Sequence, residues 1–243
     1  MPQRKVLPKV CYKITNAEKL LNGITSNELS KPKNAFLDRF GKLIILFDQK
    51  LSNGVMFIVF ENRFEQLFLD HINIYAKLTK SAVEKINEHV VHVLDGNEEG
   101  IVFPQNAGHL QLTKMRPENE MSEEEYTLLR LENNIPVQGI DFGHEMFLDT
   151  GIDAVSFAKG CFLGQEVMER VDRSKPQRKI VRILYDTIPE NATVKGEAVG
   201  KITSSAFSKK YGKFICFTMI RRYEEEVDDG MVVKERSEVQ PRE

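Results

Sequence analysis

The sequence predicts an α+β fold in two parts, a larger mixed domain followed by a small β-barrel. Helix-like and strand-like segments alternate through the first 173 residues, and after residues 172–179 only short strand candidates without a helical period follow. A chain of 243 residues is also long enough to bury a sizeable core. We therefore expect an α+β domain over residues 1–175, a β-barrel over 176–223 and a charged tail over 224–243.

Four residue pairs in the first part have the spacing of a capping box, in which Ser, Thr or Asn precedes Glu by three positions at the start of a helix. They are Thr15–Glu18, Asn62–Glu65, Ser81–Glu84 and Ser122–Glu125. We expect a helix after each pair, the first ending at Gly23 and the last near Asn134, just before Pro136.

Runs of β-branched and aromatic residues predict the strands. In the first part they are residues 42–47, 55–60 and 90–94, and Gly54 suits a hairpin turn between the first two. His89 and His92 would point to opposite faces of the third strand, which favours a strand over a metal site. In the second part the strand candidates are residues 180–185, 198–203 and 213–219. The charged stretch from residue 224 predicts a solvated tail.

Charge and hydropathy argue against several classes of protein. The 34 basic and 36 acidic residues give a net charge of −2, which indicates no nucleic-acid-binding surface. The longest apolar runs, residues 43–47 and 55–60, are far shorter than the ~20 residues that span a bilayer. No apolar signal segment follows the basic start of the chain, so we expect a cytoplasmic protein without nucleic-acid or membrane partners.

The three cysteines, Cys11, Cys161 and Cys216, form no C-x-x-C pair. Their odd number argues against a disulfide framework and against a zinc site made by this chain alone. It also argues against a stably held iron–sulfur cluster, which normally takes four cysteine ligands. Any cluster chemistry would therefore be assistance given to another protein.

The segment KGCFLGQE, residues 159–166, is the main candidate for function. Gly160 and Gly164 favour a tight loop around Cys161, and apolar residues at helical spacing after Gln165 predict that a helix follows. The N–H groups at the start of that helix and the ammonium group of Lys159 would favour the thiolate form of the cysteine. A buried cysteine packed as a small hydrophobe is the alternative, and the flanking glycines and charges argue against it.

This octapeptide resembles the K-G-C-aromatic-x-G-Q-E signature of the YgfZ group. These proteins are folate-binding relatives of the glycine-cleavage T-protein (aminomethyltransferase) that support iron–sulfur cluster assembly or repair. Further segments are similar to the family in the same order, namely residues 20–30, 35–47, 129–141 and 197–222. The resemblance implies a T-protein/YgfZ-like folate-binding domain with a central cavity, a small C-terminal β-barrel, and tetrahydrofolate or a one-carbon-substituted folate as ligand.

The resemblance also assigns ligand-binding residues. The stretch LRLENNIPVQGID, residues 129–141, is similar to the T-protein pattern R-L-E-x-G-x-P-x-x-G-x-D, whose glutamate hydrogen-bonds the pterin ring. Glu132 would take that role with Arg130 beside it, since the two oxygens of a carboxylate match two adjacent N–H donors. Without the resemblance, both would be exposed helix residues. Asn27 and Glu28 are carried over from the family's L-x-T-N-D segment, which is altered here to ITSNE.

One feature of the T-proteins is missing from the sequence. Their catalytic acid lies a few positions after the glycine turn, where this chain reads GKLIIL over residues 41–46 and has Ile45 in the acid's place. Asp48 is the nearest acid, ~10 Å further along a strand and on its opposite face. This substitution argues against aminomethyl transfer and leaves the folate site in place.

Three functions are compatible with these patterns. The first is a tetrahydrofolate-binding accessory protein that serves iron–sulfur client or assembly proteins. In it, Cys161 is a nucleophile or transient ligand beside the folate cavity, supported by Lys159 and Gln165. The second is a folate-dependent aminomethyltransferase or methyltransferase. The third is a non-enzymatic interaction module that retains the fold.

Overall fold

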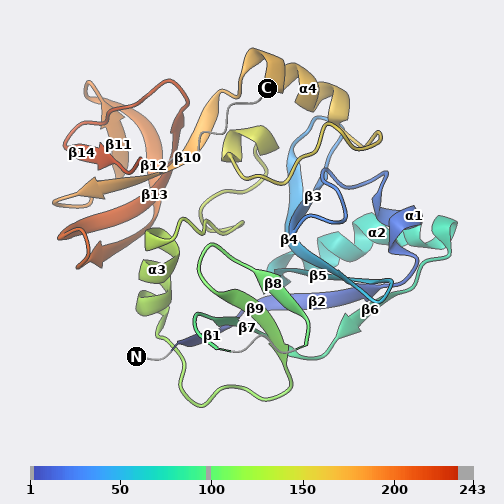
Figure 1. Ribbon diagram of the computed structural model, residues 1–243. Helices are drawn as coiled ribbons and strands as arrows, with labels where there is room; N and C mark the ends of the chain where they lie inside the picture. Colours follow the sequence, from blue (N-terminus) through green and yellow to red (C-terminus); the bar gives the residue numbers. More distant parts are fainter. Residues whose placement is uncertain (1–2, 97–99, 235–243) are drawn as a thin grey trace.

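The computed structural model describes residues 3–96 and 100–234. Its strands form three antiparallel sheets of five, four and five strands, and the described residues add four α-helices. Figure 1 shows the sheet nearest the C-terminus on the opposite side of the molecule from α1 (Ala17–Leu21) and α2 (Glu65–Thr79), with α4 (Gln165–Ser174) above the centre. The protein is thus a strand-rich α+β fold, as the sequence predicts.

The first sheet has the strand order β3, β4, β5, β2, β6. These strands span Lys33–Leu37, Leu43–Ser52, Val55–Glu61, Lys9–Ile14 and Val83–Ile86. The helices α1 (Ala17–Leu21) and α2 (Glu65–Thr79) cover one face, and the 3-10 helix η1 (Asn62–Phe64) leads into α2. At the predicted β4–β5 turn, Asn53 and Gly54 have φ angles of 50° and 77°, the left-handed conformation that two-residue hairpins require.

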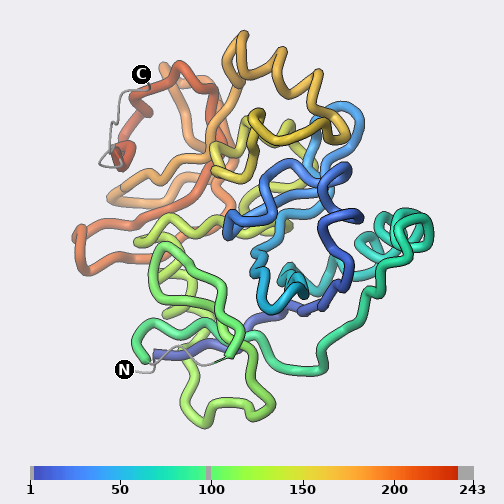
Figure 2. Tube along the Cα trace, turned by 45° about the vertical axis from the view of Figure 1, so that its right-hand side comes forward, coloured from blue at the N-terminus to red at the C-terminus, as the bar shows by residue number. Residues whose placement is uncertain are grey.

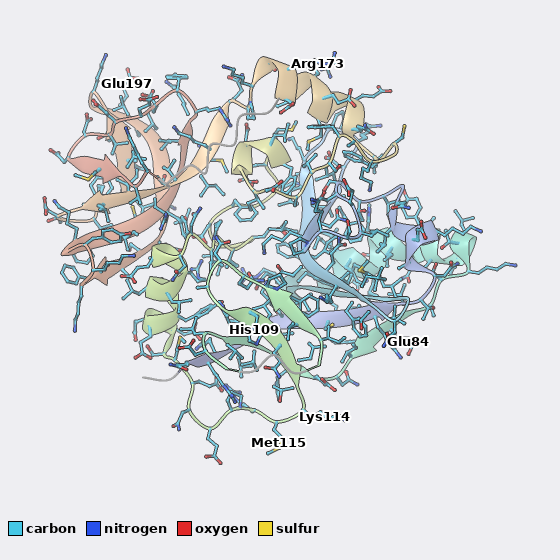
Figure 3. All side chains as sticks on the ribbon, viewed as in Figure 1. Glu84, His109, Lys114, Met115, Arg173 and Glu197 are labelled. Atoms are coloured by element: carbon cyan, nitrogen blue, oxygen red, sulfur yellow. The ribbon has the colours of Figure 1, made fainter. Side chains whose placement is uncertain are left out.

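The second sheet has the order β1, β7, β9, β8. Its strands span Arg4–Leu7, His89–Val93, His109–Thr113 and Val102–Pro104. It packs on the other face of the first sheet through a core that includes Val59 and Phe103, and α3 (Glu123–Glu132) adds Tyr126 to this core. Figure 3 shows His109 in the interior, whereas Met115 lies on a loop that extends from the body and is 80% exposed.

The third sheet has the order β11, β12, β13, β10, β14. Its strands span Asn191–Val194, Glu197–Ser208, Lys213–Arg221, Arg178–Tyr185 and Gly230–Val232. The sheet curls into a half-barrel (Figure 2) and packs on α3 through Leu131 and Phe217. The 3-10 helix η2 (Phe147–Thr150) lies against β10. The predicted boundary at residue 175 falls between α4 and β10.

The helix predictions are confirmed in part. Ser122 caps α3 in a complete capping box, and helical structure also follows Thr15 and Asn62, although neither side chain caps it. The helix predicted after Ser81 is wrong, because this segment forms β6 and pairs with β2 at the edge of the first sheet. Two long-range β-pairings of apolar residues, Val83 with Ile14 and Ile86 with Cys11, outweigh the local helix signal.

The solvated tail predicted from residue 224 is wrong as far as residue 234. β14 pairs with β10, and Val227 is buried in the core of the third sheet. Residues 235–243 lie outside the described part of the chain. β11 and β14 escaped the sequence analysis because each is too short to show a strand period. Within the described residues, no helix combines the length and the apolar character needed to cross a bilayer.

Candidate functional site

A cavity of about 760 Å³ lies at the centre of the molecule, where the three sheets meet. Distant chain segments converge there, as Figures 1 and 2 show. The walls are formed by Lys33 and Leu46 of the first sheet, Gln105 and Asn106 of the β8–β9 turn, residues 134–136, residues 150–153, residues 179–182 of β10, and residues 225 and 232–234. The volume lies within the ~300–1,000 Å³ range of small-molecule sites.

Asp48 lies behind the wall that Lys33 and Gln105 form. The β3–β4 register places Lys33 directly opposite Asp48, and the lysine Nζ donates to Asp48 Oδ1 at 2.5 Å. Gln105 Nε2 donates to the same oxygen at 2.9 Å. Burial by itself would raise the pKa of Asp48, but the positive charges of Lys33 and Lys9 outweigh it and hold that pKa below its usual value. The carboxylate is therefore a buried, ionised acceptor.

The two faces of β4 have different environments. Ile45 is fully buried in the core under α2, whereas Leu46 lines the cavity and Asp48 shares its face. Asp48 lies on the opposite face from Ile45, as the strand period predicts. That face carries Leu46 of the cavity wall, so an acid lies directly behind the wall, although not at the position expected from the T-proteins.

The β8–β9 turn, residues 105–108, is held on both sides. Gly108 has a φ of +67°, and a Cβ there would lie 2.0 Å from the carbonyl oxygen of Val93, so only glycine fits. Asn106 Nδ2 donates to the carbonyl oxygens of Asn133 and Asn134 at 3.1 and 2.9 Å. This turn therefore connects the Asp48 side of the cavity to the wall that follows α3.

Glu132 and Arg130 do not line the cavity, although residues 134–136 of the same predicted motif do. The Glu132 carboxylate, in the last turn of α3, accepts a hydrogen bond from Ser208 Oγ of β12 at 2.5 Å. Arg182, a cavity residue, donates to the backbone carbonyl of Glu132 at 2.8 Å. The motif predicted to bind pterin thus supplies part of the wall, while its glutamate contacts the third sheet.

Arg130 belongs to a buried network with Asp141. Its Nη1 donates to Asp141 Oδ2 at 2.7 Å, and the two side chains are only 5% and 0% exposed. Ser204 of β12 donates to Asp141 Oδ1, and Arg130 Nη2 donates to Ser204. The resemblance assigns Arg130 to the folate site, whereas the structure places its guanidinium in the junction between α3 and the third sheet.

Cys161 is exposed and lies in the loop before α4, away from the cavity walls. Next to it, the backbone N–H of Phe162 donates to Gln165 Oε1 at 3.2 Å, so the glutamine orders the loop. Gly164 has a φ of +85°, and a Cβ there would lie 2.5 Å from the carbonyl oxygen of Asp38 in the β3–β4 turn. The predicted loop and helix are confirmed. The structure does not place the thiol in the cavity.

Lys159 points into the protein rather than into solvent. Its Nζ donates to the carbonyl oxygens of Thr25 and Asn27 at 2.6 and 3.1 Å, and burial lowers the pKa of the ammonium to about 8. Asn27 is itself buried, and its Nδ2 donates to Lys33 O. Of the predicted site residues, the structure brings these two together. Lys159 anchors the KGCFLGQE loop to residues 25–27.

No motif in the sequence marks Lys33, Asp48 or Gln105 as site residues. The one local signal was an acid directly after the apolar run LIILF, because an ionisable residue in a buried strand needs a partner. Lys33, the partner of Asp48, is on the neighbouring strand β3, and Gln105 is in a turn of the second sheet. The three residues are therefore not related by any fixed spacing in the sequence. Among the described residues, no three His, Cys, Asp or Glu side chains are grouped as metal ligands would be.

Comparison with solved structures gives a clear match in fold. The chain is similar to the crystal structure of the glycine cleavage system aminomethyltransferase T from Bartonella henselae, with a TM-score of 0.74 and 14% sequence identity. The match covers 90% of this chain and 79% of that chain. The chain has a T-protein-like fold. No family model and no curated protein matches the sequence, so membership of the YgfZ group stays a prediction.

Proposed function

We propose that this protein binds tetrahydrofolate, or a one-carbon-substituted folate, in the central cavity and acts as an accessory protein in iron–sulfur cluster assembly or repair. The observation that carries the proposal is the central cavity within a T-protein-like fold. Its walls have the chemistry that a folate needs. Leu46, Pro136 and Ile180 offer apolar surface to a flat ring, and Lys179 and Lys234 offer positive charge to carboxylates.

Binding is tested by calorimetry and thermal shift with 5-formyltetrahydrofolate. A ligand at a hundredfold excess over its Kd adds about 2.7 kcal/mol of stability, which raises the Tm of a chain of this size by roughly 5–11 °C. Leu46→Trp places an indole ring in the apolar wall of the cavity and should reduce the shift. Leu51→Trp is the matched control, since Leu51 lies on the same strand and is 52% exposed. If the wild type shows neither heat nor a shift, the fold serves as an interaction module without folate.

Cys161 is the proposed point of contact with an iron–sulfur client or assembly protein. It is the one exposed cysteine of the three, on a loop fixed by Lys159, Gln165 and Gly164. An exposed thiol is available to another protein as a nucleophile or transient ligand. In a deletion strain, Cys161→Ala should therefore lower the activity of iron–sulfur enzymes while folate affinity in vitro stays unchanged. Full activity of the strain would remove the cysteine from the mechanism.

A second candidate is a folate-dependent one-carbon transferase, and the specific observation that favours it is the ionised Asp48 beside the cavity. It predicts turnover of a one-carbon unit between tetrahydrofolate and an amine, thiol or O-methyl donor. Folate binding without turnover across a panel of such donors would leave the accessory role as the better account.

A further inference from the structure

Two polar groups beside the cavity have unused hydrogen-bonding capacity. Both donors to Asp48, Lys33 Nζ and Gln105 Nε2, bind its Oδ1, and no donor from the described residues is paired with Oδ2. In the described part of the chain, the fully buried polar atoms without a partner are His71 Nε2, His109 Nε2 and Tyr185 OH. Asp48 Oδ2 is not one of them. An oxygen without a partner that is not fully buried must keep some accessible surface, and the Asp48 side chain as a whole is 7% exposed.

Lys33 is the second of these groups. Its ammonium has three N–H donors, and its described hydrogen bonds, to Asp48 Oδ1 at 2.5 Å and to Gln105 Oε1 at 3.4 Å, use two of them. The side chain lines the cavity and is 29% exposed. A free donor therefore lies next to a free acceptor, and the ion pair between Lys33 and Asp48 fixes their relative position.

An adjacent acceptor and donor are complementary to a particular ligand edge. A ring N–H next to a ring carbonyl, the lactam arrangement, offers a donor to the carboxylate and an acceptor to the ammonium. Charge-assisted hydrogen bonds of this kind are about twice as strong as neutral ones. Leu46, two positions from Asp48 on the same face of β4, supplies apolar surface for such a ring.

We propose that Asp48 and Lys33 form the recognition site for the lactam edge of a heterocyclic ligand in the central cavity. The inference rests on the proposed folate function, because the pterin ring of folate carries such an N–H and carbonyl pair. It moves pterin recognition from Glu132 to Asp48. Neither carboxylate is itself part of the cavity wall. The Glu132 carboxylate accepts a hydrogen bond from Ser208 of the third sheet, whereas the Asp48 carboxylate lies directly behind Lys33 and Gln105 of the wall and has an unpaired oxygen.

The neighbourhood of this pair keeps it in position. Gln105 bonds to both members and is presented by the turn that Gly108 and Asn106 hold. The low pKa of Asp48 keeps its carboxylate ionised near neutral pH, so it acts only as an acceptor. A ligand edge that carries only acceptors would leave the carboxylate without a donor, and this unpaired charge is costly. The site should therefore discriminate against such ligands in favour of those that carry an N–H donor.

The test compares two probes, 5-formyltetrahydrofolate and p-aminobenzoylglutamate, which lacks the pterin ring. Asp48→Asn should weaken binding of the folate by about 10- to 100-fold and leave binding of p-aminobenzoylglutamate unchanged. Asp186→Asn is the matched control, because its ion pair with Lys213 is on the surface and Asp186 is 81% exposed. Equal folate affinity in Asp48→Asn and wild type would overturn the inference.

A double variant guards against a folding defect. Asp48→Leu with Lys33→Met replaces the whole buried pair by apolar groups, which costs less than leaving one charge alone. If it melts near the wild-type temperature and loses the folate but not p-aminobenzoylglutamate, the inference is supported. Equal losses for both probes would assign Asp48 a purely structural role and overturn it. If wild type binds neither probe, the proposed folate function itself fails, an outcome distinct from the others.

Discussion

The buried pair of Arg130 and Asp141 gives a stability prediction whose size follows from the geometry. Four donors converge on the Asp141 carboxylate: Arg130 Nη1 and Val137 N reach Oδ2, and Ser204 Oγ and Thr203 Oγ1 reach Oδ1. In Asp141→Asn, one of these positions becomes an NH₂ group. The amide can turn its oxygen toward Arg130 and Val137 and its NH₂ group toward the two hydroxyls, which can accept, but the Arg130 charge loses its counter-ion.

Breaking a buried ion pair in this way costs about 3–5 kcal/mol. For a chain of this size the Tm should fall by roughly 6–20 °C. We would measure it by thermal and urea denaturation, followed by circular dichroism and by tyrosine fluorescence, since the chain has no tryptophan. Asp186→Asn, which affects an exposed pair, should cost less than about 1 kcal/mol.

A loss below about 1 kcal/mol for Asp141→Asn would refute this reasoning. It would mean that the guanidinium of Arg130 reaches water or another partner in solution. Its assignment to the junction of α3 and the third sheet would then be wrong, and a role in ligand binding would again be open.

Three further predictions concern single residues. Gly108→Ala should cost at least about 2 kcal/mol and lower folate affinity. Gly212→Ala, with a similar φ of +64° and open space around its Cβ, should cost less and leave folate affinity unchanged, because Gly212 does not line the cavity; denaturation and calorimetry measure both effects. In the native protein, iodoacetamide should alkylate Cys161 well before Cys11 and Cys216, because both of these are buried and burial raises their pKa to about 12. Peptide mass mapping measures the labelling, and equal labelling of all three cysteines would contradict the prediction. Burial lowers the pKa of Lys159 from 10.5 to about 8. Between about pH 8 and pH 10.5 the unfolded chain therefore holds a proton on this lysine that the folded protein has lost. Because unfolding takes up this proton, the free energy of unfolding should rise with pH across that range. Lys159→Met should remove this rise in the free energy of unfolding, and an identical pH profile in both proteins would contradict it.

Local patterns predicted the elements that depend on local physics. The β4–β5 hairpin follows from two apolar runs and a turn glycine, and the capping box at Ser122 sets the start of α3. The segment after Ser81 has the same local signal, and it forms a strand because β2 offers it a partner. Two segments with the same capping-box spacing thus form different structures, because their tertiary neighbours differ and a local pattern does not contain those neighbours.

The site was harder to predict than the fold. Cys161 was correctly expected on a tight loop before a helix, since glycines and helical spacing are local features. The cavity instead collects residues from Lys33 to Lys234, and no pattern within one segment shows that they meet. The buried position of Arg130 was unpredictable for the same reason: its partner Asp141 is eleven residues away, but the burial of the pair comes from β12.

The separation of Cys161 from the cavity has a consequence for how the protein could work with two molecules at once. The thiol is on an exposed loop before α4, and the cavity walls come from other segments. Under the proposed function, folate and client would therefore bind in either order, because neither would occupy the other's place. A compound that fills the cavity would displace the folate and leave the cysteine open to reaction.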